Sequence, residues 1–182
     1  MINRILRLIE AAAKPVTMAI DGPCCSGKST LASEISKALD CNIIRCDDFF
    51  LAPNAVRGDF NIYIDGLIDL LERLPKRLGD TATYEKYCCR LGTYENIEIG
   101  YKPITIVEGV YSLAPPLRAF YSFTVWVEVD LDTRLDRLKT RNPHNYDRFV
   151  GEWIPREDRY FAKYGVREYA DVAVNSLRDT VL

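Results

Sequence analysis

The sequence predicts an α/β fold, with a parallel β-sheet between layers of helices, built as one domain over residues 1–182. Short apolar segments that resemble buried strands alternate with segments whose apolar residues recur at helical spacing. This alternation is typical of a parallel sheet with crossover helices on both faces. No internal repeat, low-complexity tract or Gly/Ser-rich linker divides the chain, and its 182 residues suit a single domain.

The order of elements follows from these patterns. Strands are expected at 16–20, 43–44, 104–107, 125–129 and 171–174. Helices are expected in the opening segment before Pro15, and at 31–39, 67–74 and 131–140. Residues 49–61 are interpreted as a loop over a site, and residues 81–101 as either a hairpin or an irregular excursion. Because ligands of such sheets bind at the carboxyl ends of the strands, polar residues at those ends are candidates for function.

Composition narrows the classes of function. The net charge of −2 and the pI near 5.5 argue against a protein that coats nucleic acid, which would carry a basic excess. The six cysteines form neither a CxxC metal site nor a dense disulfide framework, and predict reduced thiols in a cytoplasmic enzyme. The N-terminus lacks a signal-peptide core, and no apolar run reaches the ~20 residues of a membrane span.

One segment matches a phosphate-binding motif in both spacing and context. Gly22-x-x-x-x-Gly27-Lys28-Ser29 has the Walker A spacing, with an apolar strand before it and an amphipathic helix after it. Glycines let successive N–H groups point at phosphate oxygens, and the helix N-terminus adds further donors. Lys28 is expected to contact the β- and γ-phosphates, and the Ser29 hydroxyl to join a Mg²⁺ shell. The predicted ATP-binding residues are Gly22, Cys25, Ser26, Gly27, Lys28, Ser29, Thr30, Arg137 and Arg141.

Carboxylates follow two of the expected strands. Asp47 and Asp48 follow the second strand, where an acid can take the proton from a hydroxyl that attacks the γ-phosphate. Successive side chains of a strand point in opposite directions, so one of the two is expected to face the site; the alternative for Asp47 is a turn or helix cap. Glu108 ends the strand 104–107, where an acid would hold Mg²⁺ or, alternatively, only orient a loop.

Three arginines share one face of the helix expected at 131–140. Arg134, Arg137 and Arg141 lie about a quarter-turn from a stripe of leucines (131, 135 and 138) that is expected to pack inward. Guanidinium groups suit phosphate oxygens and neutralise charge during phosphoryl transfer; the alternative is a solvated charged face. The segment that follows is interpreted as a lid at about 141–152, with His144 as a surface residue.

The motifs together resemble the uridine kinase-like family of P-loop kinases, which includes nicotinamide riboside kinases and phosphoribulokinase. The resemblance rests on AIDGPCCSGKST, CDDFF, IVEGVYSL, VEVDLDTRLDRLKTR and EWIPREDRYF…YADVAVN, which cover residues 16–175 in order.

The resemblance implies a P-loop fold of three layers with a five-stranded parallel sheet and a lid, using ATP and Mg²⁺ to phosphorylate a small-molecule alcohol. It implies that Asp47 is the general base, that Lys28 and Arg137 act on the phosphates, and that Ser29 and Glu108 hold the metal. Residues 175–177 would lie beside the adenine.

The acceptor is left open by the sequence. A nucleoside is favoured by the resemblance, but Cys88-Cys89 follow Tyr87 where nucleoside kinases usually carry Tyr-Asp. The alternatives are a kinase for a non-nucleoside metabolite, such as a sugar, a vitamin precursor or a phosphorylated pentose, and a regulatory module that only binds nucleotide. Neither a nucleic acid nor a membrane is expected as a partner. Candidate substrate contacts are Asp47, Phe50, Tyr63, Tyr84, Tyr87 and Arg90, with ordinary aromatic packing as the alternative for the aromatic residues.

Overall fold

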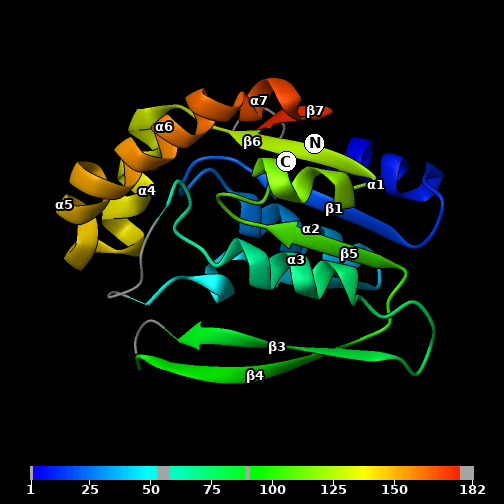
Figure 1. Cartoon of the computed structure of the whole chain (residues 1–182). Helices are drawn as coiled ribbons and strands as arrows, with labels where there is room; N and C mark the ends of the chain where they lie inside the picture. The colour runs from blue at the N-terminus through cyan, green and yellow to red at the C-terminus, as the bar shows by residue number, and fades with distance from the viewer. Residues whose placement is uncertain (1, 53–57, 89–90, 177–182) are drawn as a thin grey trace.

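The computed structural model describes residues 2–52, 58–88 and 91–176. Its centre is a five-stranded sheet in the order β2-β5-β1-β6-β7, with every neighbouring pair parallel. The strands are β1 (Val16–Asp21), β2 (Cys41–Arg45), β5 (Ile104–Glu108), β6 (Phe123–Glu128) and β7 (Val172–Asn175). The expected fold class is therefore confirmed, as are five strands close to their predicted positions (Figure 1).

The helices and short helical turns connect the strands. The longer ones are α1 (Ile2–Ala11), α2 (Lys28–Ala38), α3 (Ile64–Glu72), α4 (Leu131–Arg141) and α6 (Ile154–Tyr164). The shorter ones are η1 (Cys46–Phe49), η2 (Pro115–Phe120), η3 (Pro143–Asn145), α5 (Tyr146–Arg148), η4 (Phe149–Trp153) and α7 (Val166–Tyr169). In the part of the chain described here, none of the helices has the length and apolar character needed to cross a lipid bilayer.

Alternation along each strand creates two apolar layers. Met18 and Ile20 of β1 face a cluster with α1 and α2, whereas Ala19 faces a second cluster with α3, η2 and α6. Trp126 of β6 faces that second cluster, while its neighbours 125 and 127 face the first. Because both faces of a parallel sheet are covered, its strands must be apolar on both sides, which explains their continuous apolar runs.

The segment left open as a hairpin or an excursion is a hairpin. β3 (Thr81–Cys88) pairs antiparallel with β4 (Thr93–Gly100), and the pair lies beside α3, separate from the central sheet (Figure 1). Tyr84 and Ala82 of β3 point into the α3 cluster, whereas the side chains of β4 are largely exposed. The hairpin thus adds one apolar face to the core beneath α3.

Candidate active site

The phosphate loop joins β1 to α2 through backbone that favours glycine. Gly22 has φ +147° and Gly27 has φ +107°, and Cys25 between them has φ +59°. A Cβ atom on Gly22 would lie 2.2 Å from the carbonyl oxygen of Val127 on β6, so a side chain is excluded there. The loop then enters α2, whose first backbone N–H groups lack partners within the helix and form an anion-binding end.

Lys28 is folded against the loop that it follows. Its Nζ donates hydrogen bonds to the carbonyl oxygens of Gly22 at 2.7 Å and Pro23 at 2.9 Å, and the residue is only 8% exposed. These partners are neutral, so the charge of the ammonium group is available to an anion in the loop. The position agrees with the expected contact to phosphates.

The acids predicted at two strand ends reach one cavity. Ser29 Oγ donates to Glu108 Oε2 at 3.2 Å, and Asp47 lines the same cavity with Lys28. Desolvation by the cavity wall raises the pKa of Asp47, and burial raises that of Glu108. The Lys28 ammonium opposes the rise in each case. Two distant segments therefore converge on the phosphate loop, as the sheet-edge rule predicts.

Ser29 and Glu108 fit a magnesium ion by their chemistry. Magnesium binds oxygen ligands and is usually held by one or two carboxylates together with phosphates and water. Within residues 2–52, 58–88 and 91–176, no group of three or more His, Cys, Asp or Glu side chains is arranged to hold a metal by itself. Most ligands of a magnesium ion here would accordingly come from a nucleotide and from water.

Asp48 is turned away from its neighbour Asp47. Its carboxylate accepts a hydrogen bond from the Tyr84 hydroxyl at 2.9 Å and lies 3.5 Å from the Lys86 ammonium. The two acids follow β2 as expected, but they lie on a single turn of 3₁₀ helix, η1, and not in the strand geometry from which their opposite directions were predicted. The geometry of this turn points the two carboxylates in different directions. Asp48 links the turn to the hairpin through Tyr84 and Lys86 of β3.

The arginines of α4 contact the phosphate loop, but not as the leucine stripe predicted. Leu131 is 51% exposed, whereas Arg134 is 6% exposed and lies in the contact. Arg134 Nε donates to the Cys24 carbonyl at 3.1 Å, and its Nη2 lies 3.4 Å from the Glu157 carboxylate of α6. The expected inward stripe is wrong at its first position because the polar backbone of the loop, and not an apolar surface, faces that part of α4.

Arg137 lies one turn further along the same helix. Its Nη1 donates to the Cys25 carbonyl at 3.0 Å and to Ser176 Oγ at 3.1 Å, which joins α4, the loop and the segment after β7. Arg137 and Arg141 both line the cavity. The solvated-face alternative therefore fails for Arg134 and Arg137, while Arg141 is an exposed residue at the cavity mouth.

The cavity has a volume of about 1310 Å³, above the range usual for a single small-molecule site, which leaves room for two ligands. Ten of the predicted site residues line it: Cys25, Gly27, Lys28, Ser29, Thr30, Asp47, Phe50, Glu108, Arg137 and Arg141. Gly22 and Ser26 belong to the loop without lining the cavity. Ser176 lines it in the region expected for adenine, whereas residue 177 lies outside the described residues.

Of the aromatic substrate candidates, Phe50 lines the cavity, whereas the three tyrosines do not. Tyr84 stacks on Phe49 with ring centroids 5.2 Å apart, and Tyr87 packs on Tyr94 at the same separation. Tyr63 is 56% exposed and lies at a separate shallow surface pocket. The packing alternative therefore describes Tyr84 and Tyr87, whereas Tyr63 is a surface residue. Arg90 lies outside the described residues.

Sequence reasoning missed two buried acids that support the loop. Asp21 accepts hydrogen bonds from the backbone N–H groups of Gly22 and Leu113 and from the Tyr160 hydroxyl, at 2.6, 2.9 and 2.8 Å. Burial raises the pKa of Asp21 to about 6 and that of Glu157 to about 8. Glu157 accepts the Cys24 N–H at 2.9 Å. The available signal for Asp21 was its position directly before the first glycine of the loop. The signal for Glu157 was its place in the segment EWIPREDRYF that carried the family resemblance.

Three further residues that line the cavity were also missed. They are Asn61, Tyr111 and Arg156, from the segment before α3, the turn after β5 and the first turn of α6. Tyr111 and Arg156 lie within the segments IVEGVYSL and EWIPREDRYF that carried the family resemblance, but no role was assigned to either of them, and Asn61 lies in no motif. Only the fold brings the three together.

Solved structures of other proteins have the same fold as this chain. A possible uridine kinase from Bacillus stearothermophilus superposes with a TM-score of 0.73 at 19% identity, covering 96% of this chain and 97% of that one. A candidate fructose transport system kinase from Silicibacter sp. TM1040 superposes with a TM-score of 0.64 at 19% identity, covering 96% and 98%. At these identities the likeness shows a shared fold, and it confirms the expected P-loop kinase-like architecture.

Sequence comparisons give the family. No curated protein matches this chain by sequence. The family model described as an AAA domain matches residues 18–160, which include the phosphate loop, both strand-end acids and the arginines of α4. By this match over most of its length, and by the nucleotide-binding loop within it, the chain belongs to the AAA domain family of P-loop proteins.

Proposed function

We propose that this protein is an ATP-dependent phosphotransferase that moves the γ-phosphate to a hydroxyl group of a small molecule. The observation that carries the proposal is the shared cavity: Lys28 and Ser29 of the phosphate loop line it together with the carboxylate of Asp47. A protein that only bound nucleotide would not need an acid beside the terminal phosphate. A transferase needs one to take the proton of the attacking hydroxyl.

Each residue of the site has a distinct role in the proposed reaction. Backbone N–H groups at the start of α2 and the Lys28 ammonium hold the phosphates and stabilise the charge that develops on them. A magnesium ion held by Ser29 and Glu108 would neutralise phosphate charge. Asp47 accepts the proton of the acceptor hydroxyl as the oxygen bonds to the γ-phosphorus and the bond to the β-phosphate oxygen breaks, which releases ADP. Arg137 and Arg141 border the nucleotide from α4.

The acceptor proposed is an alcohol, with a nucleoside and a sugar as the two candidate classes. The first follows the possible uridine kinase with the same fold, and the second the candidate fructose transport system kinase. An ADP-release screen over nucleosides, sugars and vitamin precursors would distinguish them. Turnover with none of these, together with normal ATP binding, would favour a regulatory nucleotide-binding module.

Asp47→Asn tests the role of the acid. We expect this variant to bind ATP as the unchanged protein does but to lose turnover by roughly 10²-fold or more, because no group then takes the proton. The measurements are calorimetric binding of ATP·Mg²⁺ and ADP release with the best acceptor of the screen. Asp48→Asn is the matched control, since that neighbour faces Tyr84 rather than the cavity. Near-normal turnover by Asp47→Asn would remove this residue from the mechanism.

A further inference from the structure

Arg156 is a cation in the cavity wall that makes no ion pair with a described residue. It lies in the first turn of α6, is half-buried, and lines the cavity. Its Nη2 donates to the Gly58 carbonyl at 2.9 Å, and the Tyr111 hydroxyl interacts with it. Among the described residues it forms no ion pair, and the nearby Asp59 carboxylate is held instead by Lys163 and Tyr164.

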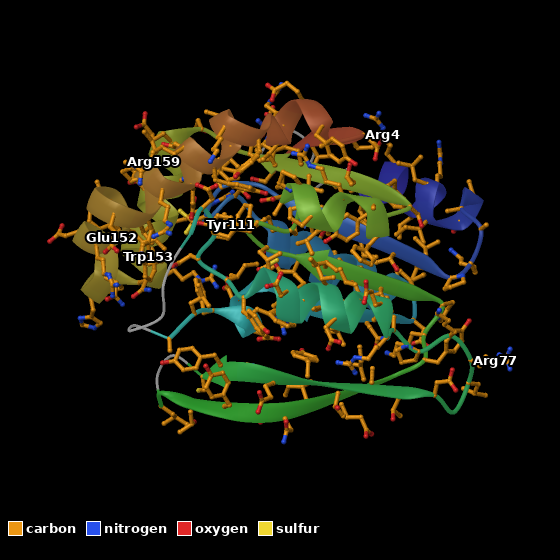
Figure 2. All side chains as sticks on the ribbon, in the orientation of Figure 1. Arg4, Arg77, Tyr111, Glu152, Trp153 and Arg159 are labelled. Atoms are coloured by element: carbon orange, nitrogen blue, oxygen red, sulfur yellow. The ribbon has the colours of Figure 1, made fainter. Side chains whose placement is uncertain are left out.

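The contacts of Arg156 differ from those of Arg137, the arginine of α4 that is proposed to border the nucleotide. Arg137 contacts the loop and Ser176, whereas Arg156 contacts the segment before α3 and the turn that follows Glu108. Figure 2 shows Tyr111 between the central sheet and the helical group that carries Trp153. Arg156 is thus on the same side as the elements that present Asp47 and Glu108, where an acceptor would bind.

Two other polar atoms at the cavity are buried without a hydrogen-bond partner in residues 2–52, 58–88 and 91–176. Asn61 is 7% exposed, and its Oδ1 makes no hydrogen bond. The indole Nε1 of Trp153 is likewise buried and unpaired, and both residues line the cavity. Buried polar atoms are nearly always paired in folded proteins, so an unpaired acceptor and an unpaired donor in one cavity wall indicate a polar ligand. Such a ligand would offer a hydrogen to Asn61 and an oxygen to Trp153.

We infer that the acceptor alcohol carries an oxyanion, a phosphate or a carboxylate, which Arg156 binds, while Asn61 accepts a hydrogen bond from one of its hydroxyl groups. The inference rests on the proposed function and narrows its acceptor. A guanidinium suits oxyanions because it donates two parallel hydrogen bonds. A partly buried cation that forms no ion pair with a described residue favours an anionic ligand. The product would then carry its original oxyanion and a new phosphate ester.

The γ-phosphate of ATP is the other anion that Arg156 could bind, so the test must fill that position first. The protein is saturated with the non-hydrolysable analogue AMPPNP and Mg²⁺, and inorganic phosphate and acetate are titrated separately by calorimetry. We expect phosphate, acetate or both to bind to the loaded protein. We further expect Arg156→Gln to weaken that binding at least about tenfold and to leave the affinity for AMPPNP unchanged.

Two variants control this experiment. Arg159→Gln removes an exposed arginine on the same helix and should leave both affinities unchanged. Arg156→Lys keeps the charge without the fork and should recover part of the oxyanion affinity. Unchanged AMPPNP affinity in Arg156→Gln also shows that this variant is folded.

The outcomes separate this inference from the proposed function. Equal oxyanion binding in Arg156→Gln, no binding of either oxyanion, or binding only when AMPPNP is absent would each overturn it while the nucleotide site stands. Failure to bind AMPPNP would overturn both. In the turnover assay, ribose 5-phosphate and glycerate should release ADP with a kcat/KM at least about tenfold above ribose and glycerol; the reverse preference contradicts the inference.

Discussion

At the scale of the residue, two aspartates at the ends of β1 and β2 have different surroundings. Asp21 is fully buried and bonded to three donors, whereas Asp47 lines the cavity. The first therefore holds the phosphate loop in place, and the second is available to a ligand. The difference is one of position in the fold, since nothing in the side chain distinguishes them.

The buried carboxyl predicts a pH dependence of stability. The pKa of Asp21 is raised by burial from 3.8 to about 6, so the folded state binds this proton more tightly than the unfolded state. The free energy of unfolding should then fall as pH rises from about 4 to about 6 and level off above that, by about 3 kcal/mol from this group. Urea unfolding between pH 4 and 7 of the unchanged protein and of Asp21→Asn measures the effect. Parallel stability curves for the two proteins would contradict it.

At the scale of the element, the phosphate loop depends on space that only a glycine leaves. Gly22→Ala would bring a Cβ atom to 2.2 Å from the Val127 carbonyl, in backbone at φ +147°. We expect a loss of about 2 kcal/mol or more in unfolding free energy, with loss of ATP binding, because the loop must move. Thermal unfolding and calorimetry measure both.

Gly100→Ala is the control for that change. Nothing lies within 4 Å of the Cβ atom it would add at the end of β4. Stability and ATP affinity should stay close to those of the unchanged protein. A similar effect of the two substitutions would show that crowding against β6 is not the cause.

The contact between α4 and α6 gives a second prediction at this scale. Arg134 and Glu157 are 8% and 9% exposed as side chains, so removing Arg134 leaves the Glu157 carboxyl group and the Cys24 carbonyl oxygen buried without this donor. Arg134→Met should lower the free energy of unfolding by about 3 kcal/mol. The exposed pair Arg148–Glu152 provides the control: Arg148→Met should cost under about 1 kcal/mol in the same urea titration. Equal effects would show that burial of the pair is not decisive.

At the scale of the whole molecule, nucleotide binding should be coupled to stability. A ligand that binds only the folded state at 100 times its Kd adds about 2.7 kcal/mol to the free energy of unfolding. We expect ATP·Mg²⁺ to raise the Tm, EDTA to reduce that rise, and Lys28→Ala to abolish it, because the ammonium is the loop's cation. Lys76→Ala, on an exposed turn, should keep the full rise. An undiminished rise in Lys28→Ala would contradict the assigned phosphate site.

The sequence by itself determined the α/β fold class, the five strands, the phosphate loop and the acids at two strand ends. Those features depend on local information: glycine spacing, apolar period and the rule that parallel strands end at one edge. Contacts between distant segments were decided only in the tertiary structure. In that structure Arg134 is buried on the face of α4 that the leucines were expected to bury. The rings of Tyr84 and Tyr87 are packed against other aromatic rings. Asn61, Tyr111 and Arg156, from three separate segments, line one cavity. The helical or strand period shows which face of an element is apolar, but not which other element packs against that face. The residues that surround a charged side chain decide whether it stabilises the fold or is available to bind a ligand.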